Sequence, residues 1–486
     1  MKASQVPLIF AAAIAAACGC LPCAGEDVKE ADVRNNLRTA ATTKIPDERV
    51  TSIRWLKIHC PPDHPLLING ARDKSTALVV LEVVDNAGRD ALPTLRAAVE
   101  SGHPEAPGYA LKRIASFEPD GLDICAEYLS DRKVSAAAAK IILFSNLILE
   151  RHLTLIVERC LAGSDPADLD APVLDNIGGS AGRLNATEHL AIFADLFFSA
   201  RGDRWQAGNR LLVSFFSSTR NTDWTTDVNR QRLRAFETRL NDYVTGIGKM
   251  PFKAGSTTGR AGFSSYTYEK YSIASKEHNA WRLYGSIISL KTPPDDAEAR
   301  IAFLTRYAAS PEYNIRARAV AFDTFLKAIH ADRAKRLIDL YFVGDSDAQL
   351  SVISTIEAEY FKDVDGNNDP HVIMGFYSLF ALDPRTQPDV LWDVFYRLSR
   401  NFDEFIDWTI PMNRDNTLID YKRGVRINPK PYRDLISSRW LSNKDKIIVK
   451  INAISPSVSA EMQRLVLGLT PDAPLSGSNG GINIDK

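Results

Sequence analysis

The chain has 486 residues, of which 45% are hydrophobic and 24% are charged, so it contains enough apolar material for substantial cores and is neither disordered nor collagen-like. Its 59 Lys and Arg residues balance 60 Asp and Glu residues. The net charge of -1 excludes a globally basic nucleic-acid binder, and no nucleic-acid partner is expected. The length predicts two or three domains, unless the chain is a repeat array whose core lengthens instead of thickening.

The N-terminus has the pattern of a signal peptide. Lys2 precedes an apolar run over 6–17, and small residues follow over 18–25. The run is too short to span a hydrocarbon core of about 30 Å, so a cleaved export signal is favoured over a permanent transmembrane helix. Cys18 and Cys20 follow small residues and resemble the bacterial lipoprotein signal, in which a cysteine becomes the lipidated first residue. We expect either lipidation at one of them or cleavage near the end of the small-residue stretch. The mature chain would then be periplasmic or lipid-anchored to the cell envelope, with no transmembrane span.

Three cysteines remain after such cleavage, at Cys60, Cys125 and Cys160. An oxidising compartment permits disulfides, but an odd count of three allows at most one bridge. Cys125 and Cys160 lie on apolar segments, where buried free thiols are common. We therefore expect buried free thiols here.

Between residues 90 and 217, amphipathic segments of about 12 residues alternate with short turns that contain Pro or Gly. Apolar residues recur at the i, i+3, i+4, i+7 spacing of helices. The anchors that open successive helix pairs are separated by 30, 31 and 37 residues, and they are Leu92, Leu122, Leu153 and Leu190. Such a period predicts helical hairpins stacked side by side.

One predicted helix opens with Ala91-Leu92-Pro93-Thr94-Leu95, and a Pro-containing turn and an Ala-rich second helix follow it. The pattern resembles HEAT-type or armadillo-type repeats over 76–217 and, more loosely, over 297–409. The resemblance implies an all-α fold, an α-solenoid of antiparallel helix pairs, with an elongated helical surface used for binding. It carries over no catalytic residue.

The second half is predicted to continue the helical array. Its expected helices cover 299–308, 315–329, 334–342, 350–361, 372–382 and 390–405. An aromatic stripe in the last two is interpreted as core between helices, and it consists of Phe376, Tyr377, Phe380, Trp392, Phe395 and Tyr396. A small irregular or β-containing cap is expected at each end, with a short strand or cap over 50–60 and a strand over 447–451.

The expected organisation along the chain has seven parts. They are a signal peptide (1–24), an N-terminal linker and cap (25–75), HEAT-like repeats (76–244), a basic-aromatic loop rich in Gly and Ser (245–282), a second helical array (283–412), a basic C-terminal segment (413–470) and a disordered tail (471–486).

The loop over 245–282 contains many Gly, Ser and Thr residues, which exclude regular helix, and long loops are often functional. Basic and aromatic side chains alternate along it and suit an anionic glycan or another polyanion. The candidate binding residues are Lys249, Lys253, Arg260, Tyr266, Tyr268 and Trp281. Its glycine spacing does not fit a phosphate-cradling loop, so nucleotide binding is excluded.

The segment over 414–450 contains ten basic and four acidic residues. A solvated basic face is the simplest interpretation, and anionic lipid headgroups or an acidic partner are the alternatives.

One group of residues with metal-binding side chains consists of His59, Cys60, Asp63 and His64, since Cys and His together suit zinc. Prolines constrain this loop, and no matching pair of ligands is evident elsewhere. We therefore expect neither a metal nor a cofactor.

Metalloprotease and esterase motifs are absent from the sequence. A carbohydrate-active enzyme that resembles a polysaccharide lyase is the alternative function. Its base, its carboxylate-neutralising pair and its proton donor would come from His278, Asn279, Arg282 and Tyr271. The leading hypothesis is a non-enzymatic scaffold that binds a protein partner in the bacterial cell envelope through its helical face. A binder of polyanions or lipid surfaces, acting through 414–450, is a third hypothesis.

Overall fold

A computed structural model describes residues 29–117, 120–145, 147–162, 169–251, 263, 275–402 and 430–468. Within these ranges every regular element is a helix, and the one β-type pairing is an isolated bridge between Lys362 and Asn368. The predicted all-α fold class is confirmed. The chain divides into two compact units, Met1–Ser180 and Ala181–Lys486.

The first unit is built from short helices joined by tight turns. They are α1 (Glu30–Thr42), α2 (Pro46–His59), α3 (Pro65–Arg72), α4 (Ala77–Val84), η1 (Gly88–Ala91), α5 (Leu92–Val99), α6 (Ala106–Ala115), α7 (Gly121–Glu127), η2 (Tyr128–Ser130), α8 (Ser135–Leu143), α9 (Glu150–Ile156) and the π-helical η3 (Val157–Ala162). Helix α10 (Ala171–Arg183) runs across the division between the units. Proline stands in the first turn of α2, α3, α5 and α6, where its fixed φ and missing N–H suit a helix start.

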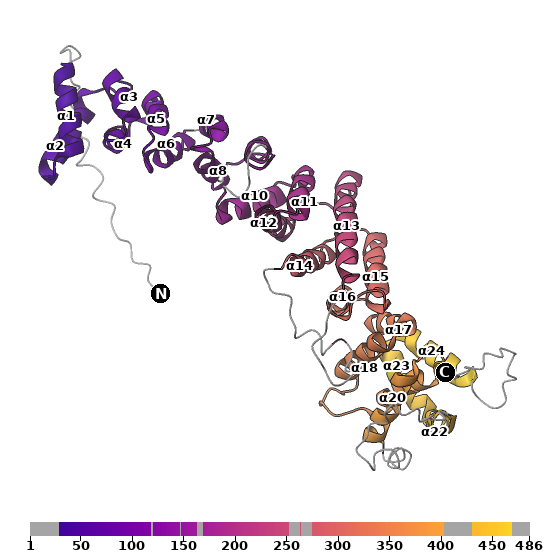
Figure 1. The fold of residues 1–486 in the computed structure, drawn as a ribbon. Coiled ribbons are helices and arrows are strands. Elements are labelled where there is room, and N and C mark those ends of the chain that lie inside the picture. Colours follow the sequence, from indigo (N-terminus) through magenta and orange to yellow (C-terminus); the bar gives the residue numbers. More distant parts are fainter. Residues whose placement is uncertain are drawn as a thin grey trace, which may run out of the picture. The chain divides into compact units, whose positions relative to one another are not determined.

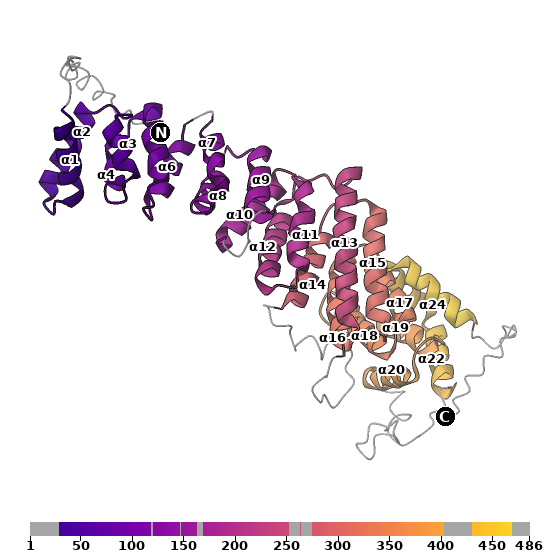
Figure 2. The same ribbon diagram turned by 45° about the horizontal axis from the view of Figure 1, so that its top comes forward.

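The helices of the first unit follow one another in consecutive pairs (Figure 1 and Figure 2). Helix α3 contacts its partner α4 and also α5 of the next pair, and α6 contacts α4, α5 and α8. Leu95, Leu111 and Ile142 are buried in these contacts. The arrangement is helical repeat-like, as the sequence predicts.

Ion pairs link successive helix pairs across the first unit. Arg96 donates to both oxygens of the Glu127 carboxylate, at 2.6 and 3.1 Å, and these residues are 31 positions apart. Arg89 pairs with Asp120 at the same separation. The separation agrees with the 30- and 31-residue spacing of the predicted helix anchors.

The second unit contains longer helices. They are η5 (Thr187–His189), α11 (Leu190–Phe198), α12 (Gly202–Ser218), α13 (Asp227–Gly248), α14 (Lys276–Ile288), α15 (Pro294–Ala309), α16 (Ile315–Ala328), α17 (Arg333–Val343), α18 (Ser346–Tyr360), α19 (Pro370–Leu382), α20 (Pro388–Asn401), α22 (Lys430–Ser442), α23 (Lys444–Ile454) and α24 (Pro456–Gly468). Helices α15 to α20 correspond to the six predicted for the second array. Side chains of Asn314, Asp345 and Asp369 accept backbone N–H groups at the starts of α16, α18 and α19, so local capping defines these starts.

Helix α19 is the buried centre of the C-terminal part of the chain. It contacts α20, α22, α23 and α24, and the aromatic stripe that begins on it is core, as predicted: Phe376, Tyr377 and Phe380 are at most 1% exposed. A Cβ on Gly375 would lie 2.8 Å from the Ile451 side chain, so α19 and α23 approach closely.

The strand predicted over 447–451 is wrong, and so is the strand alternative for 50–60. The segment at 447–451 belongs to α23, and Ile447 and Ile451 are buried one helical turn apart against α19. The segment at 50–60 belongs mostly to α2, where Ile53 and Leu56 are buried. In both segments helical packing outweighs the β propensity of branched residues. Together with α1 and α3, α2 also fills most of the range expected to be a linker and cap.

Candidate functional site

Most of the predicted binding residues lie outside the described residues, and so does Tyr271 of the predicted catalytic set. The binding residues concerned are Lys253, Arg260, Tyr266 and Tyr268. Lys249 is exposed at the C-terminal end of α13. Trp281 is 3% exposed, and its ring contacts those of Tyr284 and Tyr307. Trp281 is therefore a core residue of α14, and its assignment to a binding surface is wrong.

The other three residues of the predicted catalytic set lie on α14. Asn279 is buried, and its side chain donates to the Ser275 carbonyl oxygen at 2.9 Å. Arg282, three positions further along the same helix, is exposed. His278 follows Ser275 in the first turn, where its backbone N–H donates to the Ser275 hydroxyl at 3.2 Å. Because Tyr271 lies outside the described residues, the lyase-like alternative stays a prediction.

Two residues of the predicted metal-binding group, His59 and His64, make local contacts within and at the start of helices. The Trp55 carbonyl oxygen lies 2.8 Å from Nδ1 of His59, whose ring stacks on Trp55. Nδ1 of His64 accepts the Leu66 N–H at the start of α3. Among the residues that the structure describes, no group of three or more His, Cys, Asp or Glu side chains is arranged to hold a metal ion.

The three cysteines of the described chain are free and buried, as predicted. Burial raises the pKa of Cys60 and Cys160 to about 11 and that of Cys125 to about 12. These thiols therefore stay protonated at neutral pH and are poor nucleophiles. The lipidation candidates Cys18 and Cys20 lie outside the described residues, as does the whole predicted signal peptide.

The predicted basic segment is described only from Lys430 onward. Two of its bases take part in packing: Arg433 donates to the Ala381 carbonyl oxygen at 2.9 Å, and Lys450 pairs with Asp369 at 2.8 Å. Both attach C-terminal helices to α19. No helix within the described ranges combines the length and the apolar composition needed to cross a membrane.

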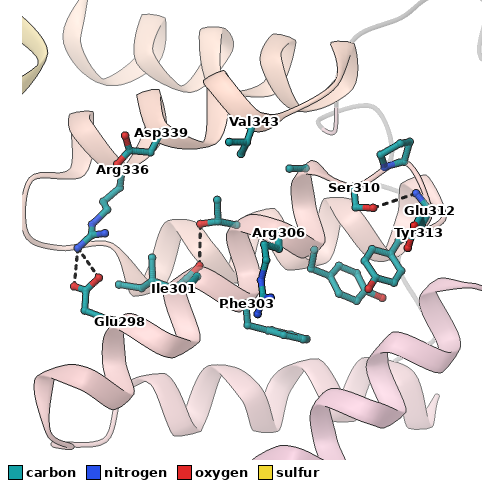
Figure 3. Close-up of a pocket in the computed structure, with 15 residues that line it drawn as sticks. Glu298, Ile301, Phe303, Arg306, Ser310, Glu312, Tyr313, Arg336, Asp339 and Val343 are labelled. Carbon is teal, nitrogen blue, oxygen red and sulfur yellow. Dashed lines mark hydrogen bonds and ion pairs between the residues drawn. The ribbon is translucent and has the colours of Figure 1, made fainter. Parts of the chain in front are cut away.

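A cavity of about 810 Å³, which we call the α15–α17 cavity, lies between these two helices and the loop that follows α15. Figure 3 shows Val343 and Asp339 of α17 facing Ile301, Phe303 and Arg306 of α15. Val343 is 63% exposed although it is fully apolar. Sequence reasoning missed this site because its walls come from different helices.

The aromatic end of the α15–α17 cavity is firmly built. The rings of Tyr307 and Tyr313 stack with their centroids 4.0 Å apart, and the Tyr307 hydroxyl donates to the Val244 carbonyl oxygen at 2.7 Å. The Asn314 side chain donates to the Gly248 carbonyl oxygen at 3.1 Å, which ties the loop to the end of α13. The cavity is thus largely preformed, as ligand sites usually are.

Two arginines line the α15–α17 cavity, and only one of them forms an ion pair among the residues that the structure describes. Arg336 donates to the Glu298 carboxylate at 2.6 Å (Figure 3), and Asp339 pairs with Lys335. Arg306 is exposed and forms no ion pair with any residue in the described ranges. Its guanidinium is therefore available to an incoming acidic group.

Comparison of the chain with family models, with curated proteins and with solved structures finds no match.

Proposed function

We propose that the protein is an exported, non-enzymatic helical-repeat scaffold that binds a segment of a partner protein in the bacterial cell envelope. The α15–α17 cavity receives that segment. The observation that carries the proposal is an exposed apolar and aromatic wall beside the available guanidinium of Arg306.

The chemistry of the cavity defines the kind of segment. Val343, Ile301 and the Tyr313 ring offer contacts to apolar side chains, and buried Tyr and Arg contacts commonly dominate protein interfaces. Arg306 adds a bidentate donor for a carboxylate. The segment therefore presents apolar side chains next to an Asp or Glu.

The scaffold role and the location are supported by other features. Helical repeats present extended surfaces for binding, and the chain's all-α, repeat-like architecture suits that role. The apolar run and small residues before residue 26 support export.

Site-specific photo-cross-linking tests the proposal. A photoreactive phenylalanine derivative replaces Val343 in the tagged full-length chain within its native cell envelope, and mass spectrometry identifies the cross-linked peptide. The matched control carries the same probe at Val228 of α13, an equally apolar residue that is 57% exposed outside the cavity. We expect a specific adduct at position 343 only, with an apolar and acidic peptide.

Charge reversal provides the second readout. Arg306→Glu should lower the cross-linking yield at position 343 at least about tenfold, because like charges then face each other. Equal labelling at positions 228 and 343, or a yield that Arg306→Glu does not change, would contradict the proposal.

A further inference from the structure

A second cavity, of about 490 Å³, lies where α18, α19 and α20 meet, and we call it the α18–α20 cavity. Its volume lies in the range of small-molecule sites. Most of its lining side chains are polar, unlike those of the α15–α17 cavity. The residues that matter for binding are Glu357, Tyr377, Asp393, Arg397, Arg400 and Asn401.

An ordered network forms the inner wall. The Tyr377 hydroxyl donates to one oxygen of Glu357, and Arg397 donates to the other. Arg397 also donates through Nε to one oxygen of Asp393. Although burial alone would lower it, the pKa of Arg397 is raised by the carboxylates of Asp393 and Glu357, so the guanidinium stays charged. This wall is fixed before any ligand arrives.

The rim offers groups that the network does not use. Arg400 is exposed, and it forms neither an ion pair nor a hydrogen bond with the described residues. The Asn401 side chain donates its amide N–H to the Arg397 carbonyl oxygen at 2.8 Å, which leaves the amide oxygen as an acceptor. The second oxygen of Asp393 is a further acceptor beside them.

The charge balance selects among anions. Glu357 and Asp393 together offset Arg397 and Arg400, so the four ionic groups sum to zero. A dianion such as phosphate would be repelled by the two carboxylates, and only one unpaired guanidinium, that of Arg400, would attract it. A monoanion whose other groups both donate and accept hydrogen bonds fits the wall better, because guanidinium, amide and carboxylate groups then all find partners.

We propose that the α18–α20 cavity binds an acidic sugar, a pyranose uronate, with its carboxylate on Arg400. Its ring hydroxyl groups face Asp393 and Asn401, and the edge of Tyr377 closes the inner end. The planar guanidinium of Arg400 matches a carboxylate bidentately. This proposal is independent of the partner segment, because the two cavities share no residue.

Titration of the full-length protein with glucuronate, followed by ligand-observed NMR, tests the proposal. Glucose is the matched neutral ligand, since it has the same ring without the carboxylate. We expect saturable binding of glucuronate and markedly weaker binding of glucose. Arg400→Gln should weaken glucuronate binding by about tenfold, the loss of one charge-assisted contact.

Two further variants keep the result interpretable. Arg306→Gln removes an exposed arginine from the other cavity and should leave glucuronate affinity unchanged. Asp393→Asn should weaken binding of glucose, since it replaces one of the two acceptor oxygens that face the sugar ring. Circular dichroism verifies that each variant is folded.

The proposal is overturned if glucuronate does not bind saturably, if glucose binds equally well, or if Arg400→Gln binds like the unmodified protein. Displacement of glucuronate by an equal concentration of inorganic phosphate would also overturn it and indicate a general oxyanion site. A failure of cross-linking at position 343 leaves these outcomes unaffected.

Discussion

Asp296 shows how one carboxylate can hold two helices together. Its side chain is 7% exposed at the start of α15 and accepts hydrogen bonds from Arg230 and Arg234 of α13, the shortest at 2.7 and 2.6 Å. Hydrogen bonds from Arg230, and then from Arg234, hold its pKa below the ordinary value of 3.8. Removal of such a partner would leave two guanidinium groups without their acceptor.

Asp296→Asn should lower the free energy of unfolding by about 2 kcal/mol at neutral pH. Because the folded pKa of Asp296 is lower than the unfolded one, its contribution is complete above about pH 4 and disappears as pH falls through the folded pKa. The difference between the unmodified protein and the variant should therefore shrink below pH 4. Urea unfolding of both proteins at pH 7, 4 and 3 measures this difference in the free energy of unfolding.

The matched control is Asp295→Asn, which removes an exposed carboxylate from the neighbouring position of the same helix. We expect Asp295→Asn to change the stability much less than Asp296→Asn does at pH 7, because Asp295 is exposed and forms no hydrogen bond with Arg230 or Arg234. A constant difference for Asp296→Asn across the whole pH range would show that its charge does not stabilise the fold.

At the scale of elements, helix packing decides what local sequence leaves open. Gly208 of α12 allows close approach to α11, since a Cβ there would lie 2.2 Å from the backbone nitrogen of Phe197. At Gly285 of α14, no atom of the described residues outside the neighbouring backbone lies within 4 Å of the corresponding position. The same residue type therefore serves a packing purpose in one helix and none in the other.

Gly208→Ala should destabilise the protein by about 2 kcal/mol, because α11 and α12 must move apart. Gly285→Ala should stabilise it by roughly 0.5–1 kcal/mol, because alanine loses less entropy than glycine in a helix. Urea unfolding of both variants measures the two changes. Equal effects of the two substitutions would contradict the close approach of α11 and α12.

At the scale of the whole molecule, the chain forms two compact units, each with its own core. Leu111 is fully buried in the first unit and Leu337 in the second. In helical repeat proteins each element contacts mainly its neighbours, so a local defect opens nearby helices first.

Leu111→Ala should increase hydrogen exchange in α5 to α8 and leave α15 to α19 protected, and Leu337→Ala should have the reverse effect. Each substitution removes a buried side chain at a cost of about 2–5 kcal/mol. Hydrogen exchange followed by mass spectrometry locates the change, and each variant is the control for the other. Increased exchange throughout the chain in either variant would show that the two units open as one.

The sequence by itself determined the fold class and most of the helices. Apolar residues at helical spacing, together with Pro and Gly at the turns, are local signals, and they located α15 to α20 and the core role of Phe376, Tyr377 and Phe380. The buried free thiols followed from the same apolar context.

Only the tertiary structure decided that the segments predicted as strands are helical, that Trp281 is buried and that the two cavities exist. The branched residues at 447–451 are helical because Ile447 and Ile451 pack against α19. Trp281 is buried by the rings of Tyr284 in α14 and Tyr307 in α15. Arg306 and Arg400 stand in no recognisable motif, since their cavities join residues 30 or more positions apart, such as Arg306 with Asp339 and Arg400 with Asn368. Such sites depend on which helices meet, and local spacing does not encode that.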